Sequence, residues 1–161
     1  MTAVASPIAS NSAPVQHGSF VLERHFAATP AQVFAAWATL EAKRQWFFCS
    51  DWPAAQHELD FRIGGRERNR TGPVGGPVHE YDALYHDIVP DQRIILSYSM
   101  AIGGSRISVS LLTVDLQAAG SGCQMTLTEQ LAVLDDRYPI AERKHGTNEG
   151  LNNLAAYLQH A

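Results

Sequence analysis

Glu129 stands where an apolar side chain is expected. Every second residue from Met125 to Leu131 is apolar except Glu129, so an acid interrupts the inward face of a predicted strand. An ionised carboxylate buried without a partner is too costly to persist. Glu129 must therefore be paired, protonated or turned towards a cavity that holds water or a ligand, unless this strand end reaches solvent. The pattern indicates a pocket with one acidic group and leaves its occupant open.

Three residues on other predicted strands are candidate partners of Glu129 in acid–base chemistry: His79, Tyr85 and Arg106. A carboxylate beside a neutral imidazole would hold its tautomer and raise its pKa towards a range useful for proton transfer. His79 and Tyr85 share one register of their strand, which faces either the pocket or the outside. Alternatively, His79 is a solvent-facing or hydrogen-bonded structural residue. Arg106 could attract an anionic ligand group or pair with Glu129, and such a pair would make both residues structural.

Metal and thiol chemistry find less support. Seven histidines invite a zinc hypothesis, but no pair has the close spacing of a structural zinc site. Cys49 and Cys123 lie far apart, so we expect no metal and no cofactor. Cys49 could be a nucleophile, but no basic partner is identifiable nearby, and an inert thiol is the simpler interpretation.

Composition limits the partners and the compartment. A chain of 161 residues that is 45% hydrophobic and 17% charged fits one domain with its own core. A net charge of -4 without a basic cluster argues against nucleic acid or an anionic membrane as the main partner. No secretory signal is recognisable, and no stretch reaches the roughly 20 apolar residues of a membrane-spanning helix. We therefore expect a cytoplasmic protein without membrane insertion.

The first third of the chain contains a tail, a strand and two helices. Residues 1–17 lack charge and periodicity and are expected to form a flexible tail, followed by a single domain over 18–161. A strand is predicted over 19–26. Thr29-Pro30 then predicts a helix start, because Thr caps free amides and Pro fits the first turn. A short second helix is predicted over 40–46.

Strands separated by Gly- and Pro-rich turns dominate the rest of the chain. Six strands in meander order are predicted between His57 and Leu131. The run over 66–70 is expected to be a solvated edge, whose arginines could alternatively guard a cavity mouth. The strand over 106–116 is long, which predicts a curved sheet and a bulge near residues 110–112. Residues 140–159 form a helix with an apolar stripe.

Short motifs occur along the chain in a fixed order: Arg24-His25-Phe26, Pro30, Val33-Phe34, Ala36-Trp37, Arg44-Gln45-Trp46, Asp60-Phe61-Arg62-Ile63-Gly64-Gly65, Pro90-Asp91-Gln92-Arg93-Ile94, Thr113-Val114-Asp115-Leu116 and Gly150-Leu151 with Leu154. In this order they resemble the activator of heat-shock-protein ATPase homologue family of the START-like (SRPBCC) superfamily. The resemblance covers about residues 19–160. The stretches His79-Glu80-Tyr81-Asp82 and Lys144-His145-Gly146-Thr147 look like an uncharacterised bacterial branch of that family.

The resemblance implies an α+β helix-grip (Bet v-like) fold. In this fold a curved antiparallel sheet of about seven strands wraps around a long C-terminal helix, in the order strand, two helices, six strands, helix. A cavity lies between the sheet and that helix. Many relatives have Gly-Trp where this chain has Gly150-Leu151, and the smaller Leu leaves more room. The residues expected to line or close the cavity are Trp46, Tyr98, Met100, Ser108, Ser110, Leu127, Glu129, Leu151 and Leu154.

Two main function classes follow. The first is binding of a small hydrophobic or amphipathic ligand, such as a lipid, a polyketide or an aromatic metabolite, and it needs no catalytic group. The alternative is a cyclase, dehydratase or hydrolase type of enzyme that uses Glu129 with His79, Tyr85 or Arg106. A cochaperone-like interaction domain ranks last, because the eukaryotic activators engage their chaperone through an additional domain. The resemblance also allows a homodimer, through an exposed edge strand or residues 46–52.

Overall fold

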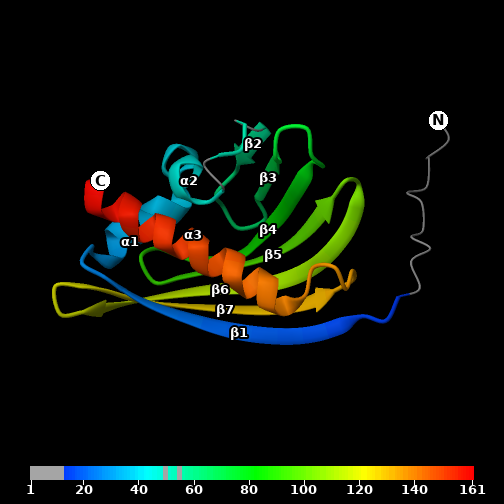
Figure 1. The fold of residues 1–161 in the computed structure, drawn as a ribbon. Helices are drawn as coiled ribbons and strands as arrows, with labels where there is room; N and C mark the ends of the chain where they lie inside the picture. The colour runs from blue at the N-terminus through cyan, green and yellow to red at the C-terminus, as the bar shows by residue number, and fades with distance from the viewer. Residues whose placement is uncertain (1–12, 49–50, 54–55) are drawn as a thin grey trace, which may run out of the picture.

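The computed structural model describes residues 13–48, 51–53 and 56–161. One seven-stranded antiparallel sheet curves around a long C-terminal helix, with strands in the order β1-β7-β6-β5-β4-β3-β2 (Figure 1). The predicted α+β helix-grip fold and its element order are confirmed. The elements are β1 (Gln16–Phe26), α1 (Pro30–Ala38), α2 (Leu40–Trp46), β2 (Gln56–Leu59), β3 (Arg66–Thr71), β4 (His79–Val89), β5 (Arg93–Ile102), β6 (Ser105–Ala119), β7 (Gly122–Val133) and α3 (Ile140–His160).

The N-terminal elements begin close to their predicted positions. Thr29 caps α1: its side chain accepts a hydrogen bond from the Gln32 amide at 3.2 Å, and its own amide donates to the Gln32 side chain at 2.9 Å. Strand β1 begins at Gln16, three residues before the predicted start, and pairs there with Val133. Residues 1–12 of the expected tail lie outside the described part of the chain.

Strand β6 contains a bulge at a position that the sequence pattern missed. Met100 pairs with Ser108 but Ala101 pairs with Arg106, so Ile107 is an extra residue in β6. The predicted bulge near residues 110–112 is wrong, because pairing with β5 is regular there. At the real bulge the consecutive residues Ile107 and Ser108 are both buried. The bulge therefore reverses which residues face inward on its N-terminal side.

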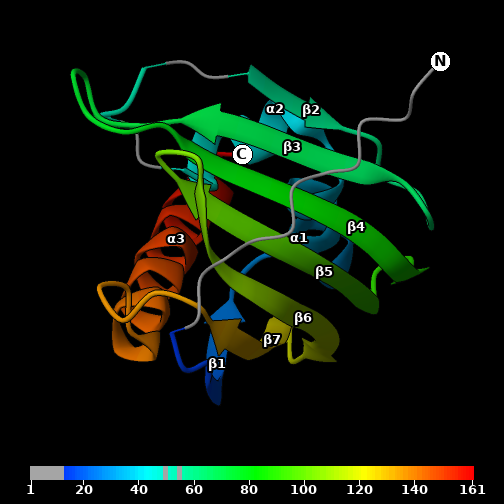
Figure 2. The same cartoon turned by 90° about the vertical axis from the view of Figure 1, so that its right-hand side faces the viewer.

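All three helices lie on the concave side of the sheet (Figures 1 and 2). The apolar stripe of α3 meets the core through Leu151 and Leu154, both almost fully buried. Trp37 of α1 and Trp46 of α2 pack edge to face, with ring centroids 4.8 Å apart. The core thus joins both ends of the chain to the middle of the sheet.

A buried ion pair fixes α2 to the sheet. Nζ of Lys43 lies 2.5 Å from Oε2 of Glu67 on β3, and both side chains are fully buried. The Tyr85 hydroxyl donates to the same oxygen at 2.6 Å, and Nε2 of His57 lies 2.7 Å from Oε1. Burial alone would raise the pKa of Glu67, but the Lys43 ammonium and these hydrogen bonds lower it to about 2. Burial lowers the pKa of Lys43.

Removing the Glu67 charge should destabilise the fold. Glu67→Gln leaves the Lys43 ammonium buried without its counter-ion, so we expect a loss of about 3–5 kcal/mol in the free energy of unfolding, measured by urea denaturation. Glu58→Gln, an exposed position on the neighbouring strand, is the matched control. Equal losses in both variants would contradict a special role for Glu67.

The same ion pair predicts how stability depends on acid. The folded-state pKa of Glu67 lies below its ordinary value of 4.5, at about 2. Its contribution is therefore complete above about pH 4.5 and is lost as the pH falls towards 2. Unfolding followed by circular dichroism across this window should show a steeper loss for the wild type than for Glu67→Gln. Parallel curves would contradict the lowered pKa.

Candidate functional site

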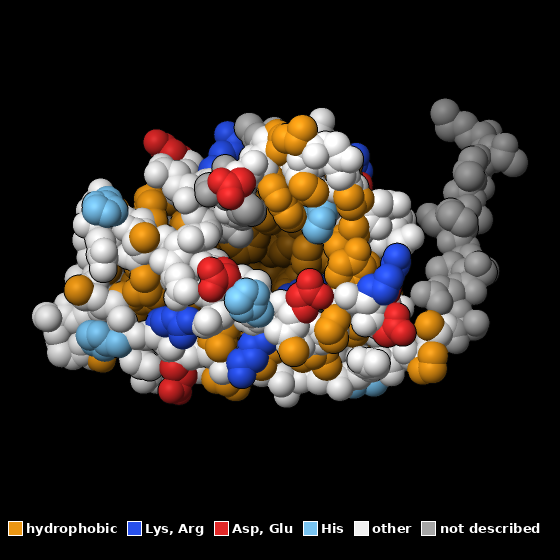
Figure 3. Space-filling model, viewed as in Figure 1, with side chains coloured by type: hydrophobic (Ala, Val, Ile, Leu, Met, Phe, Trp, Pro, Cys, Tyr) orange, Lys and Arg blue, Asp and Glu red, His pale blue; other side chains and the backbone are white. Residues whose placement is uncertain are grey.

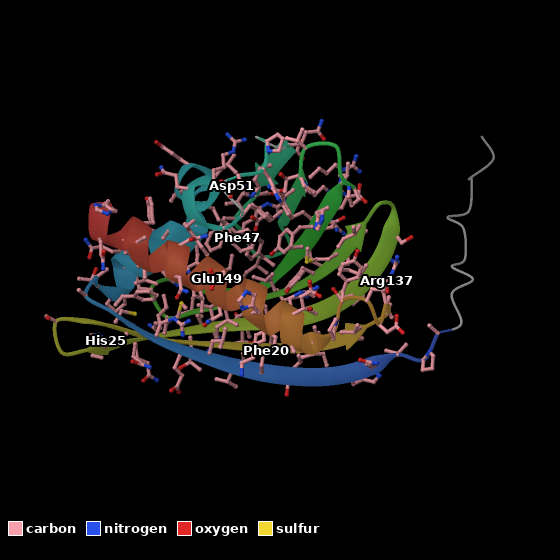
Figure 4. All side chains as sticks on the ribbon, in the orientation of Figure 1. Phe20, His25, Phe47, Asp51, Arg137 and Glu149 are labelled. Carbon is pink, nitrogen blue, oxygen red and sulfur yellow. The ribbon has the colours of Figure 1, made fainter. Side chains whose placement is uncertain are left out.

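A cavity of about 350 Å³ opens between the concave face of the sheet, the end of α2 and the first half of α3. Figure 3 shows its mouth as a hollow with apolar walls and with acidic and histidine side chains near the rim. In Figure 4, Phe47 lies at the position of this hollow, with Asp51 above it and Glu149 below it. The Trp, Phe and Tyr residues that line the cavity are Trp37, Trp46, Phe47, Phe48, Tyr81, Tyr98 and Tyr138.

Ring contacts hold the aromatic wall in place. Phe47 meets Tyr81 edge to face with ring centroids 5.3 Å apart, and Tyr81 lies 4.9 Å from Tyr98. The indole N–H of Trp46 donates to the Ala36 carbonyl at 3.0 Å, which fixes that ring. Such contacts suit aromatic quadrupoles and leave these side chains little rotamer freedom, so the aromatic wall is rigid.

The polar end of the cavity is a hydrogen-bonded cluster centred on Glu129. Arg143 extends from α3 so that its Nη1 atom lies 3.2 Å from Oε1 of Glu129 and 3.0 Å from the Tyr98 hydroxyl. That hydroxyl donates to the same Oε1. The guanidinium also donates to Ser110 Oγ at 3.2 Å and to Ser108 Oγ at 2.5 Å. Strands β5, β6 and β7 and helix α3 therefore all contribute to one cluster.

The charges in this cluster stabilise one another. Burial opposes the charge of Arg143, but Tyr98 and Glu129 outweigh burial and raise the pKa of the guanidinium. Burial raises the pKa of Tyr98, and Glu129 raises it further against the opposing effect of Arg143. Tyr98 is therefore a neutral hydrogen-bond donor, and the buried Glu129 is ion-paired. Of the possibilities left open for this acid, pairing within a cavity wall is the one observed.

One oxygen of Glu129 has no hydrogen-bond partner in the part of the chain that the structure describes. Its Oε2 is buried and makes no hydrogen bond within the described residues, whereas both oxygens of Glu67 are occupied. Trp37 Nε1 and the Tyr81 hydroxyl, on the same cavity, also lack partners within that part of the chain. A buried polar atom without a partner is costly, so these atoms favour a water or a ligand group beside them.

Comparison with known proteins gives the family. Residues 27–159 match the profile described as activator of Hsp90 ATPase homolog 1-like protein. The chain belongs to this family. With its element order, this places the protein among the START-like (SRPBCC) helix-grip domains. No curated protein matches the chain.

Solved structures agree with this family assignment. An uncharacterized protein from Rhizobium leguminosarum is 46% identical, with a TM-score of 0.88 over 92% of this chain and 98% of that chain. Mll3558 from Rhizobium loti is 42% identical, with a TM-score of 0.84 over 90% of this chain and 99% of that chain. CV1439 from Chromobacterium violaceum, at 22% identity and a TM-score of 0.74 over 87% of this chain and 96% of that chain, shares the fold.

In this family member the expected wall residues divide into three groups. Ser108 and Ser110 contact Arg143 and position it. Leu154 is fully buried in the core behind the cavity. The remaining expected residues line the cavity itself: Trp46, Tyr98, Met100, Leu127, Glu129 and Leu151.

The candidate acid–base partners of Glu129 are dispersed. His79 lines the cavity and lies 4.6 Å from Trp52, ring to ring; burial lowers its pKa, and it makes no hydrogen bond to Glu129. Tyr85 belongs to the Lys43–Glu67 cluster, so the predicted contact with Glu129 is not formed. Arg106 is exposed, and the expected pair with Glu129 is absent because the β6 bulge places Arg106 outside.

Two cations were missed by sequence reasoning, although each had a signal. Arg143 continues the stripe of Leu151 and Leu154 back towards the start of α3 at helical spacing, so it faces the sheet. Lys43 faces Glu67, whose strand was expected to be a solvated edge. That edge is only half solvated: the alternation of β3 exposes its arginines and buries Glu67 and Asn69.

Other site expectations concern metals, thiols and membranes. The described residues contain no group of three or more His, Cys, Asp or Glu that could hold a metal ion. Cys49 lies outside the described part of the chain, and Cys123 is a buried free thiol. Within the described ranges, no helix has both the length and the hydropathy to cross a bilayer.

The Glu129–Arg143 pair predicts a non-additive stability effect. Arg143→Met leaves a buried carboxylate without its cation and should cost about 3–5 kcal/mol of unfolding free energy. The double variant Arg143→Met with Glu129→Leu removes both charges and should recover most of that loss. Urea denaturation of the wild type, both single variants and the double variant measures the coupling. A double variant no more stable than Arg143→Met would contradict the pairing.

Proposed function

We propose that this protein binds a small amphipathic molecule, with its apolar body against the aromatic wall and its polar head at Glu129. The observation that carries this proposal is Oε2 of Glu129, which has no partner among the described residues and lies on the wall of a largely apolar cavity. Small-molecule sites are typically apolar concavities in which a few polar groups fix orientation. A volume of about 350 Å³ suits one or two rings or a short chain better than a long lipid.

Two glycines on α3 support a role for the empty space. Gly146 and Gly150 both line the cavity, and a Cβ added at either would meet no atom within 4 Å. Glycine inside a helix costs about 1 kcal/mol relative to alanine. Helix α3 thus carries two unfavourable residues on the face that borders the cavity, where any side chain would reduce its volume.

Ligand orientation is better supported than catalysis. Acid–base catalysis needs a second group that can take up or release the proton. Oε2 of Glu129 has no partner among the described residues, but its neighbours are the permanently charged Arg143 and Tyr98, whose raised pKa makes it a poor proton source. His79 lines the same cavity but is not hydrogen-bonded to Glu129. The cluster is built to hold a hydrogen-bonding group in place, which a binding protein requires and proton transfer does not.

Filling the cavity should abolish binding without loss of the fold. Gly150→Leu projects a side chain into the cavity, whereas Asn153→Leu adds the same side chain at an exposed position of the same helix. We expect the wild type and Asn153→Leu to bind the neutral two-ring dye Prodan with a blue-shifted emission, and Gly150→Leu to bind at least tenfold more weakly. Urea denaturation should show Gly150→Leu to be as stable as the wild type, because leucine favours helix.

Native mass spectrometry extends this test to the natural occupant. A co-purified mass that denaturation releases, present in the wild type and Asn153→Leu but absent from Gly150→Leu, would identify a ligand of this cavity. Equal dye binding by all three proteins would contradict the proposed site.

A further inference from the structure

The polar end of the cavity is balanced in charge. The negative charge of Glu129 and the positive charge of Arg143 are 3.2 Å apart, and both residues border the cavity. Burial lowers the pKa of His79, the histidine on this wall, so it is neutral. Glu142 is the other charged residue of the lining within the described chain, and it is exposed to solvent. A ligand that enters therefore meets no uncompensated charge at the buried end.

The hydrogen bonds still available at the polar end of the cavity favour one kind of ligand group. Arg143 directs its two terminal nitrogens at four acceptors, and Tyr98 donates its proton to Oε1 of Glu129. Among the described residues, the polar atom of this cluster without a partner is an acceptor, Oε2 of Glu129, whereas the unpartnered Trp37 Nε1 and Tyr81 hydroxyl line the cavity outside the cluster. A headgroup that pairs with Oε2 must donate a hydrogen bond. A carboxylate cannot donate, and it would face the unpaired oxygen of another carboxylate.

A cationic headgroup could donate but would bring a charge that nothing compensates. Glu129 is already paired with Arg143, so an added ammonium would be buried beside an existing cation. The faces of Tyr81 and Tyr98 attract cations, but this attraction is smaller than the cost of removing an ammonium from water. A hydroxyl donates the same hydrogen bond without that cost.

We infer that the cavity selects an uncharged headgroup that donates a hydrogen bond, an alcohol or phenol, over ammonium and carboxylate analogues of the same molecule. This inference rests on the proposed function and specifies the chemistry of its ligand. The buried Glu129–Arg143 pair is the selecting element: it supplies an acceptor of fixed position while keeping the net charge of the site at zero.

Three compounds with one bicyclic aromatic body test the inference: naphthylethanol, naphthylethylamine and naphthylacetate. Isothermal titration calorimetry of the wild-type protein near neutral pH should give at least tenfold tighter binding for the alcohol than for either charged compound. The order of affinities of the three compounds for the wild-type protein needs no substitution. It therefore tests the inference even where a variant fails to fold.

Glu129→Gln gives a second, independent outcome. It leaves the Arg143 cation without its counter-ion, so naphthylacetate should gain, relative to naphthylethanol, by more than the wild-type preference for the alcohol and become the preferred ligand. Glu149→Gln removes one negative charge from the exposed face of α3, outside the lining, and should leave the wild-type ranking unchanged.

The outcomes separate the inference from the proposed function. If a charged compound binds the wild type as tightly as the alcohol, or Glu129→Gln folds and keeps the wild-type ranking, the headgroup inference is overturned and the binding function stands. If none of the three compounds binds, the proposed function fails, and the inference fails with it.

Discussion

The structure depends on one constraint: a carboxylate buried in a sheet needs a cation. Glu67 and Glu129 both lie on the concave face, and a helix supplies the partner of each, Lys43 from α2 and Arg143 from α3. Each carboxylate also accepts a hydrogen bond from a tyrosine hydroxyl: Tyr85 on β4 donates to Glu67, and Tyr98 on β5 donates to Glu129. A buried charge that loses its partner is strongly destabilising. The two ion pairs therefore set where the helices lie on the sheet, in addition to the apolar packing.

The two clusters share this construction, but they differ in whether the second oxygen of the carboxylate accepts a hydrogen bond. Both oxygens of Glu67 are occupied, so its cluster closes on itself and can only stabilise. One oxygen of Glu129 is open, and this residue borders the cavity. Because Arg143 and Tyr98 already fix the Glu129 side chain, a ligand need not order it on binding. The same chemical unit thus stabilises the fold at Glu67 and, under the proposed function, offers an acceptor to a ligand at Glu129.

Local sequence patterns predicted features that neighbouring residues determine, such as helix starts and the inward face of a strand. They did not predict contacts between segments that are distant in the sequence. Thr29 predicted the start of α1, and the alternation around Glu129 predicted its inward position. The bulge at Ile107 shifts one strand by one residue, which turns Arg106 outward and invalidates its expected pairing. Arg143 is close to Glu129 only because α3 crosses the sheet, and no local pattern contains that crossing. Membership of the family fixes the fold and leaves the ligand open.

Helix α3 determines both the shape and the polarity of the cavity. Gly146 and Gly150 leave space beside the sheet, and Arg143 supplies the counter-charge of the acid at the polar end. These three residues recur at near-helical spacing on one face, so they move as a unit with the helix. The sheet contributes Tyr81, Tyr98 and the acceptor Glu129, whereas α1, α2 and the residues after α2 contribute the aromatic side chains of Trp37, Trp46, Phe47 and Phe48. Substitutions on this one face of α3 would therefore alter the cavity, while the framework that holds Glu67 and Lys43 stays unaltered.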